Sequence, residues 1–275
     1  MSYAAVLVHV QTDETGRARL KSATAVADMF DATLLGLGAE MVPPLSFDND
    51  YVSADVEWYE AMSKGIEDGL AAARELFEAE TKGLAKPADW RSGVEFPGPA
   101  LSRGARRADL IVASAPGQGR PSTYRDAPAA DLAITAGRPV LVTPAAAQPF
   151  SCERVVIAWK DTREARRAVS DALPFLQRAG SVLVLEVCAE AEEPDARAHV
   201  ADVADLLKRH GARAETAVAR CHQADSGEMI LSRAAAYEAD LIVAGAYGHS
   251  RLGEWVFGGV TRELLASSRH VLLSH

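Results

Sequence analysis

A six-residue segment occurs twice in this chain, and this internal repeat constrains the fold more than any other feature of the sequence. The run Ala-Asp-Leu-Ile-Val-Ala occupies residues 108–113 and returns unchanged 131 residues later, at 239–244. The same offset aligns three further pairs: Gly117 with Gly248, Arg120 with Arg251, and the run 139–142 with 270–273. Because no gap interrupts this register, we predict two copies of one domain in tandem.

The two halves also begin alike. Short apolar runs are followed by helical patterns and then by second apolar runs, at 4–10, 17–30 and 33–37 in the first half and at 154–159, 163–176 and 181–187 in the second. Strands that alternate with helices predict a parallel sheet with helices on both faces. Continuous apolar runs such as VLVLEV suit strands that are buried on both faces.

A linker is expected between the halves. Residues 143–153 contain two prolines and an alanine run, which are typical of a connection rather than of a helix or strand. We place the first domain at 1–146 and the second at 152–275.

The first half carries an additional segment at 41–86. It begins with a Pro-Pro pair and an Asp-Asn-Asp run, which indicate a loop. Trp58, Met62, Ile66 and Leu70 then recur at helical spacing and predict a long amphipathic helix. We expect this stripe to pack against the core or the other domain rather than to form a site.

Composition excludes several classes of protein. The net charge is -9, which argues against a nucleic-acid partner, because nucleic-acid binding relies on clustered Lys and Arg. No apolar stretch reaches about 18 residues and no signal-peptide pattern is present, so we expect neither a membrane span nor export, and a cytoplasmic location. Cys152, Cys188 and Cys221 lie far apart, so neither a disulfide framework nor a metal site is expected.

Glycines cluster directly after the apolar run 239–244. Gly245 and Gly248 come first, and the pair 258–259 follows after nine residues. Open α/β sheets bind ligands at the carboxyl ends of strands, where glycine lets backbone amides approach an anion closely. The second pair also opens a helical pattern, whose N-terminal amides favour phosphate, and Thr261 adds a hydroxyl. We predict a phosphate-binding loop rather than simple turns, and neither a dinucleotide fingerprint nor a P-loop is present.

With this loop the chain resembles the universal stress protein family in a tandem form. That family is marked by Gly-x-x-Gly, nine residues, and then Gly-Ser or Gly-Thr. Gly245, Gly248 and Gly258 match the motif, Gly259 stands where the hydroxyl residue usually is, and Val260 and Thr261 match positions common in ATP-binding members.

The resemblance implies two open twisted five-stranded parallel-sheet domains of the adenine nucleotide alpha hydrolase-like fold, each a three-layer α/β/α sandwich. It also implies a stress-response role and ATP or a related adenine nucleotide as ligand, with or without magnesium. The last strands pair in family dimers, so 139–143 and 270–274 are expected to pair here. The halves would then form an intramolecular pseudo-dimer, and a further homodimer stays open.

The ligand site that the resemblance implies lies in the second half. Its residues follow the strands and fill the glycine loop: Ala158, Trp159, Lys160, Asp161, Val187, Ala244, Gly245, Tyr247, Gly248, His249, Arg251, Gly258, Gly259, Val260 and Thr261.

Several of these side chains have two interpretations. Trp159 contacts a base or, in preference, packs in the core. Arg251 and His249 touch phosphate or are solvated, and solvation is favoured for His249. Tyr247 covers the ligand or fills the turn.

Two positions depart from the family pattern. ATP-binding relatives usually carry an aspartate just after the first strand, where this chain has Lys160 and then Asp161. Lys160 either neutralises a phosphate or is solvated, and Asp161 replaces the aspartate only if the turn shifts by one residue. Gly259 removes one hydroxyl donor, worth about 1 kcal/mol, which weakens binding without abolishing it.

The first half departs further from the pattern. Ser114, Ala127 and Pro128 stand at the positions of the motif glycines, and Pro128 has no N–H to donate. Gln11 stands near the usual aspartate position. We expect no ATP site in this half, although its own glycine-rich loop leaves another anion open.

Three functions remain open from sequence. The first is a binding module whose second half takes an adenine nucleotide and regulates partner contacts. The second is a slow ATPase or nucleotidyl transferase, against which stands the lack of a secure metal carboxylate or base, so no catalytic residue is assigned. The third is a nucleotide-free structural or interaction protein, which Gly259 and the long helical segment favour.

Overall fold

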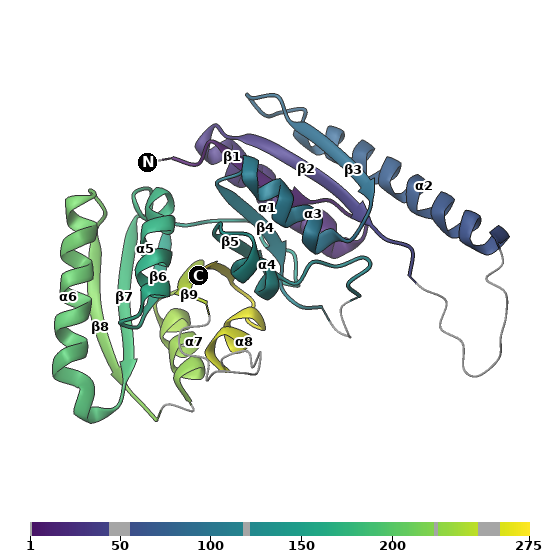
Figure 1. The fold of residues 1–275 in the computed structure, drawn as a ribbon. Coiled ribbons are helices and arrows are strands. Elements are labelled where there is room, and N and C mark those ends of the chain that lie inside the picture. The colour runs from purple at the N-terminus through teal and green to yellow at the C-terminus, as the bar shows by residue number, and fades with distance from the viewer. Residues whose placement is uncertain (1, 44–55, 118–121, 223–224, 247–258) are drawn as a thin grey trace, which may run out of the picture.

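Strands and helices alternate along the first half of the chain in the computed structural model, which describes residues 2–43, 56–117, 122–222, 225–246 and 259–275 (Figure 1). The elements of this half are β1 (Ala5–His9), α1 (Glu14–Phe30), β2 (Thr33–Glu40), α2 (Val56–Thr81), β3 (Asp89–Val94), α3 (Pro97–Gly104), η1 (Ala105–Arg107), β4 (Leu110–Ser114), α4 (Ala129–Thr135) and β5 (Val140–Thr143).

The second half repeats this order of strands and α-helices after a connection, 144–153, that contains neither helix nor strand. Its elements are β6 (Arg154–Trp159), α5 (Arg163–Leu176), β7 (Ser181–Cys188), η2 (Glu190–Glu192), α6 (Glu193–Arg209), β8 (Ala214–Arg220), α7 (Ser226–Ala236), β9 (Leu241–Gly245), α8 (Gly259–Leu265) and β10 (His270–Ser274).

All ten strands belong to one sheet, in the order β3-β2-β1-β4-β5-β10-β9-β6-β7-β8. Each half contributes five parallel strands, so the predicted fold class is confirmed. The halves meet where β5 and β10 pair antiparallel, with Leu141 opposite Leu272. This is the pairing of last strands that the family resemblance implied.

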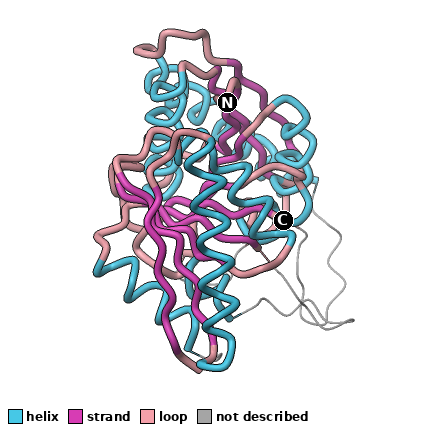
Figure 2. The backbone as a smooth tube through the Cα atoms, turned by 90° about the vertical axis from the view of Figure 1, so that its left-hand side faces the viewer, coloured by secondary structure: helices cyan, strands magenta, loops and turns pink. Residues whose placement is uncertain are grey.

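Helices cover both faces of the sheet and complete three layers (Figure 2). Successive residues of a strand point to opposite faces, so in β4 Leu110 and Val112 pack on the side of α1 and α5, while Ile111 and Ala113 pack on the side of α3 and α7. Because all four side chains are buried, this strand is covered on both faces, as its unbroken apolar run predicts.

The 131-residue offset holds over the last third of each half. It superposes β4 on β9 residue for residue, and it places α3, α4 and β5 within about two residues of α7, α8 and β10. The repeat of six residues therefore extends over four α-helices and strands, α3, β4, α4 and β5.

Helix α2 changes the interpretation of the segment 41–86. The predicted amphipathic helix is present, and its stripe continues inward through buried Ile66 and Phe77. However, α2 lies between β2 and β3, as α6 lies between β7 and β8. It is thus the counterpart of α6 rather than an extra element. The first half differs in that this helix is longer, with 26 residues in α2 against 17 in α6.

Polar caps set where the first helix of each half begins. The Asp13 carboxylate accepts a hydrogen bond from the backbone N–H of Gly16 at 2.8 Å, and the Thr162 hydroxyl accepts one from Ala165 at 3.3 Å. Helix α1 therefore starts at Glu14, three residues before the start predicted from its apolar stripe at Arg17.

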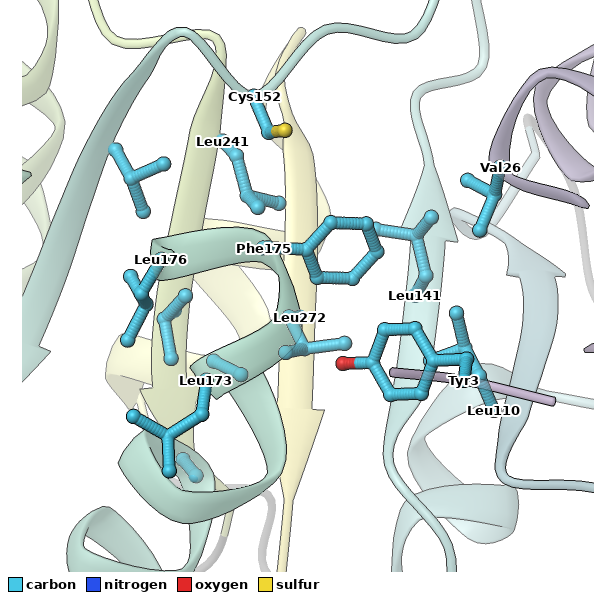
Figure 3. Packing of buried hydrophobic residues seen from close by; sticks show 14 of the residues in the cluster. Tyr3, Val26, Leu110, Leu141, Cys152, Leu173, Phe175, Leu176, Leu241 and Leu272 are labelled. Atoms are coloured by element: carbon cyan, nitrogen blue, oxygen red, sulfur yellow. The ribbon is translucent and has the colours of Figure 1, made fainter. Parts of the chain in front are cut away.

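Aromatic side chains fill the junction between the halves (Figure 3). The ring centroids of Phe30 and Phe175 lie 5.2 Å apart, and Tyr3 lies 5.1 Å from each of them. Since Phe30 ends α1 and Phe175 belongs to α5, this cluster buries side chains from both halves in one core. Among the described residues, no helix is both long and apolar enough to cross a membrane.

Candidate functional site

The strand order of the second half reverses direction between β6 and β9. From β6 the chain continues outward to β7 and β8, and it then returns to β9 and β10 on the other side. Ligands of open α/β sheets bind in the crevice outside the carboxyl ends of strands at such a switch point. The candidate site is therefore the carboxyl edge of β6 and β9.

The structure brings most of the described predicted residues to this edge. Ala158 pairs with Ala244 in register, so Lys160, which follows β6, and Gly245, the last residue of β9, lie at the ends of two adjacent strands. Val187 lies at the corresponding end of β7, next to β6. Residues remote in the sequence thus meet where the prediction placed the ligand.

Five predicted residues, all in the glycine loop, lie outside the described residues: Tyr247, Gly248, His249, Arg251 and Gly258. Both ends of the loop are described. The chain leaves the sheet at Ala246, whose N–H donates to the carbonyl of Ser274 at 2.7 Å, and it re-enters at Gly259, the first residue of α8.

Gly245 has a packing role that the sequence did not reveal. A Cβ atom built on Gly245 would lie 2.6 Å from the backbone nitrogen of Ala165 and 2.7 Å from the carbonyl carbon of Glu164. Real Cβ atoms do not approach backbone so closely, so only glycine lets the end of β9 pass the first turn of α5. The strand end and the helix N-terminus are thereby held side by side.

Lys160 and Asp161 form an exposed turn after β6. The N–H of Thr162 donates to the carbonyl of Lys160 at 2.7 Å, and the Asp161 carboxylate forms an ion pair with Arg166. The exposed Lys160 ammonium has no ion-pair partner among the described residues. It is therefore available to an anion at this edge, whereas Asp161 is already engaged.

Trp159 packs in the core, the interpretation that the sequence favoured. Its side chain is buried with α5 and α6, and its indole Nε1 has no hydrogen-bond partner in the described part of the chain. Buried polar atoms are rarely left unpaired, so this N–H is a donor that lacks an acceptor, in the residue directly before Lys160.

Gly259 and Thr261 differ in exposure on α8. Gly259 is exposed, and a Cβ atom on it would meet only the Glu263 carboxylate, at 3.9 Å. Val260 is half-buried, and Thr261 is buried. The helix start is thus open to a ligand at Gly259, while the Thr261 side chain is largely covered.

A carboxylate that the sequence analysis missed lies at the same edge. Glu186, opposite Trp159 in register, is buried, and its Oε2 lies 3.2 Å from Nδ1 of His199 on α6. Burial raises the pKa of this carboxyl, while His199 acts in the opposite direction. A single acidic letter inside the run VLVLEV was the only signal.

Comparison with known proteins identifies the second half. Residues 152–273 match the model of the Universal stress protein family. The second half of the chain belongs to the universal stress protein family. No curated protein matches the chain significantly in sequence.

Solved structures match the fold of the whole chain. A universal stress protein from Archaeoglobus fulgidus DSM 4304 has a TM-score of 0.72 at 15% identity, over 98% of this chain and 97% of that one. A protein of unknown function from Pseudomonas aeruginosa PAO1 has a TM-score of 0.62 at 16% identity, covering 99% and 92%. A putative universal stress protein from P. aeruginosa UCBPP-PA14 has a TM-score of 0.61 at 17% identity, covering 99% and 93%. At these identities the likeness concerns the fold.

In the first half, the side chain of Arg19 occupies the position that corresponds to the candidate site of the second half. Arg19 is buried and donates from Nε to the carbonyl of His9 at 2.7 Å. Its two other nitrogens donate at 2.8 Å each, to the hydroxyl of Ser114 and to Oε1 of Gln11. One guanidinium thus joins α1 to the carboxyl ends of β1 and β4.

Arg125, in the segment after β4, also contacts the residues around Arg19. Nε2 of Gln11 donates to the carbonyl of Arg125 at 3.0 Å, and the Arg125 guanidinium lies 3.2 Å from the Asp13 carboxylate. Burial lowers the pKa of Arg19 to about 10, which leaves it charged at neutral pH.

The second half of the chain has an alanine, Ala168, at the position of this arginine. Arg19 lies six residues after the cap Asp13, and Ala168 lies six residues after the cap Thr162. No side chain at Ala168 can reach across to the ends of β6 and β9. The two halves therefore share a fold and differ in what occupies the switch point.

Proposed function

We propose that the chain is a stress-response protein whose second half, residues 152–275, binds ATP or a related adenine nucleotide at the carboxyl edge of β6 and β9. The observation that carries this proposal is the pairing of Ala158 with Ala244. Because Lys160 directly follows β6, this register brings the backbone of Lys160 close to the end of β9, from which the glycine loop departs. Membership of the second half in the universal stress protein family supports an anion-binding use of that loop.

The first half, residues 1–146, is proposed to bind no nucleotide. Arg19 occupies the equivalent position and its donors are already paired with His9, Ser114 and Gln11. Nucleotide occupancy of the second half alone would then regulate the contacts of the chain with its partners.

Binding is tested on the full-length protein as purified and after addition of nucleotide. Mass spectrometry of the small molecules released by denaturation is expected to find an adenine nucleotide. Added ATP with magnesium is expected to raise the melting temperature, because a ligand of the folded state stabilises it by mass action. An empty protein that millimolar ATP does not stabilise would contradict the proposal.

A pair of matched variants distinguishes the two halves. Gly248→Val places a side chain in the glycine loop and is expected to abolish the ATP-dependent shift. Gly117→Val is its counterpart in the repeat, where an added Cβ meets nothing within 4 Å, and it is expected to leave the shift intact. Equal loss in both variants would point to a general effect on folding.

Lys160 is assigned the neutralisation of phosphate charge. Lys160→Ala is expected to weaken ATP binding by about tenfold to a hundredfold, the effect of one hydrogen bond to a charged group. Gln11→Ala, at the equivalent position before the first helix cap, is the control and is expected to leave ATP binding unchanged. If the two variants bind ATP with the same affinity, Lys160 does not contact the phosphates and its side chain is simply solvated.

We also propose that the two halves form an intramolecular pseudo-dimer. Pairing of Leu141 with Leu272 and the aromatic contact of Phe30 with Phe175 support it. The expected result is a monomeric mass by light scattering, because β5 and β10 already pair with each other within one chain and leave no free strand edge there. A stable dimer would show that a further interface exists.

A nucleotide-free interaction protein is the second candidate, and Gly259 favours it. The hydroxyl that the family motif supplies at this position is missing, although the site has room for it. An empty protein with a folded, cooperative melting transition and no response to any adenine nucleotide would favour this alternative.

A further inference from the structure

A cavity of about 440 Å³ lies on the opposite side of the first half from α1 and α2, between the sheet and the α3–η1 segment. Its floor is apolar and is formed by Leu7 of β1 and by Leu35 and Leu37 of β2, all buried. The volume falls within the range of small-molecule pockets. This cavity is separate from the carboxyl edge of β6 and β9, which belongs to the other half.

Two ion pairs bridge the cavity from the edge strand to the helix. Asp89, at the start of β3, pairs with Arg107 of η1, and Glu95, just after β3, pairs with Arg103 of α3. All four residues line the cavity. The ion pairs join the edge strand to the α3–η1 segment at two points, and their side chains form part of the wall of the cavity.

Two further arginines line the same cavity. Arg91 of β3 and Arg106 of η1 are exposed, and neither has an ion-pair partner in the described part of the chain. The cavity therefore contains four guanidinium groups and two carboxylates, in a chain whose net charge is -9. The positively charged side chains that line the cavity therefore outnumber the negatively charged ones, and they lie in the same cavity as the apolar floor.

The second half lacks this arrangement, although its backbone repeats the same elements. Register with Leu37 and Leu185 makes Ala217 the counterpart of Arg91. The repeat offset makes Ala234, Tyr237 and Glu238 the counterparts of the three other arginines, Arg103, Arg106 and Arg107. The fold alone does not require arginine at these positions.

We infer that this cavity is a second ligand site that takes an amphipathic organic anion, a molecule with an apolar body and one carboxylate or phosphate head. The apolar body lies on Leu7, Leu35 and Leu37, where it removes exposed carbon surface from water. The head lies between Arg91 and Arg106, since a guanidinium binds carboxylate and phosphate with paired, charge-assisted hydrogen bonds. Arg103 and Arg107 keep their acidic partners and shape the cavity.

Calorimetric titration of the full chain with decanoate and with decyl phosphate tests the site, at concentrations below micelle formation. Saturable binding of one molecule per chain is expected for at least one of them, and their ratio of affinities identifies the preferred head. Decanol, which lacks the charge, and inorganic phosphate, which lacks the apolar body, are each expected to bind at least about tenfold more weakly.

The double variant Arg91→Ala/Arg106→Ala is expected to weaken binding by about tenfold or more and to leave the melting temperature nearly unchanged, because both side chains are exposed. The matched control is Arg209→Ala/Arg213→Ala, two exposed arginines of the second half, which is expected to bind like the unaltered protein. Absence of saturable binding, equal affinity for decanol, or equal affinity in the two double variants would each overturn the inference. ATP binding serves as an independent readout, since it reports on the other half and is expected to stay the same in both double variants.

Discussion

The hydroxyl of Tyr3 donates a 2.6 Å hydrogen bond to the backbone carbonyl of Asp171, which joins the segment before β1 to helix α5 of the other half. Tyr3 is buried, and its ring packs against Phe30 and Phe175, one from each half. The side chain of Asp171 accepts a further hydrogen bond, at 2.6 Å, from the hydroxyl of Ser274 at the end of β10. One residue of α5 thus fixes both the N-terminal segment and the last strand.

Tyr3→Phe is expected to lower the free energy of unfolding by about 1–2 kcal/mol, because the ring stays in place while the partly buried carbonyl of Asp171 loses a hydrogen-bond donor. Urea denaturation at pH 7 measures the change. Tyr59→Phe is the control, since Tyr59 is 54% exposed on α2 and its loss of a hydroxyl is expected to have no measurable effect. Equal effects of the two variants would mean that the bond between the halves contributes nothing to stability.

Two buried histidines make stability depend on pH. Burial lowers the pKa of His270 to about 4 and, together with the charge of Arg19, lowers that of His9 to about 3. Both are lower than the value near 6.5 of an unfolded chain, so below that pH the unfolded state binds more protons than the folded state. Stability is therefore expected to fall between pH 7 and pH 5, by about 2 kcal/mol for each histidine.

Denaturation midpoints measured at several pH values test this expectation. His270→Gln is expected to remove about half of the fall, whatever it does to stability at pH 7, because the residue no longer titrates. His222→Gln, at an exposed position, is expected to leave the slope unchanged. A pH profile of His270→Gln that parallels the unaltered protein would contradict the assignment.

The repeat and the alternation of patterns were sufficient to predict the layers and the parallel strands, because these follow from local periodicity and from one gapless offset. The pairing of β5 with β10 was expected only from the resemblance to the universal stress protein family. The start of α1 was misplaced, since the apolar stripe begins at Arg17 while the cap is Asp13. The segment 41–86 was taken as an addition because its length hides its equivalence to the connection that holds α6.

The contents of the two switch points were harder to predict. Arg19 belongs to an amphipathic helix in which a polar residue is ordinarily solvated, yet its partners Ser114 and Gln11 bury it. Ser114 is 95 residues away, so no local pattern indicates the contact. Gly245 lies at the carboxyl end of β9, as the sequence predicted, but its close approach to the backbone of α5 is a second reason for a glycine that the sequence does not reveal.

Gly245→Ala is expected to destabilise the protein by about 1–3 kcal/mol, because the new methyl group overlaps the backbone of Ala165 and neither strand nor helix can move freely. Thermal and urea denaturation measure the loss. Gly69→Ala, in the middle of α2 with nothing within 4 Å of the added atom, is expected to act in the opposite direction and stabilise by about 0.5–1 kcal/mol. A neutral Gly245→Ala would show that β9 and α5 are not in fixed contact.

Gly259→Ser restores the hydroxyl that the family motif carries, at an exposed position where a Cβ atom has only the Glu263 carboxylate nearby, at 3.9 Å. One additional hydrogen bond of about 1 kcal/mol is expected to tighten ATP binding by about fivefold, without a loss of stability. Calorimetric titration with ATP and magnesium measures the affinity, and Gly259→Ala separates the hydroxyl from the effect of any side chain. If the serine and alanine variants bind ATP equally, the start of α8 does not contact the phosphates, and the proposed nucleotide site must rest on the end of β6 alone.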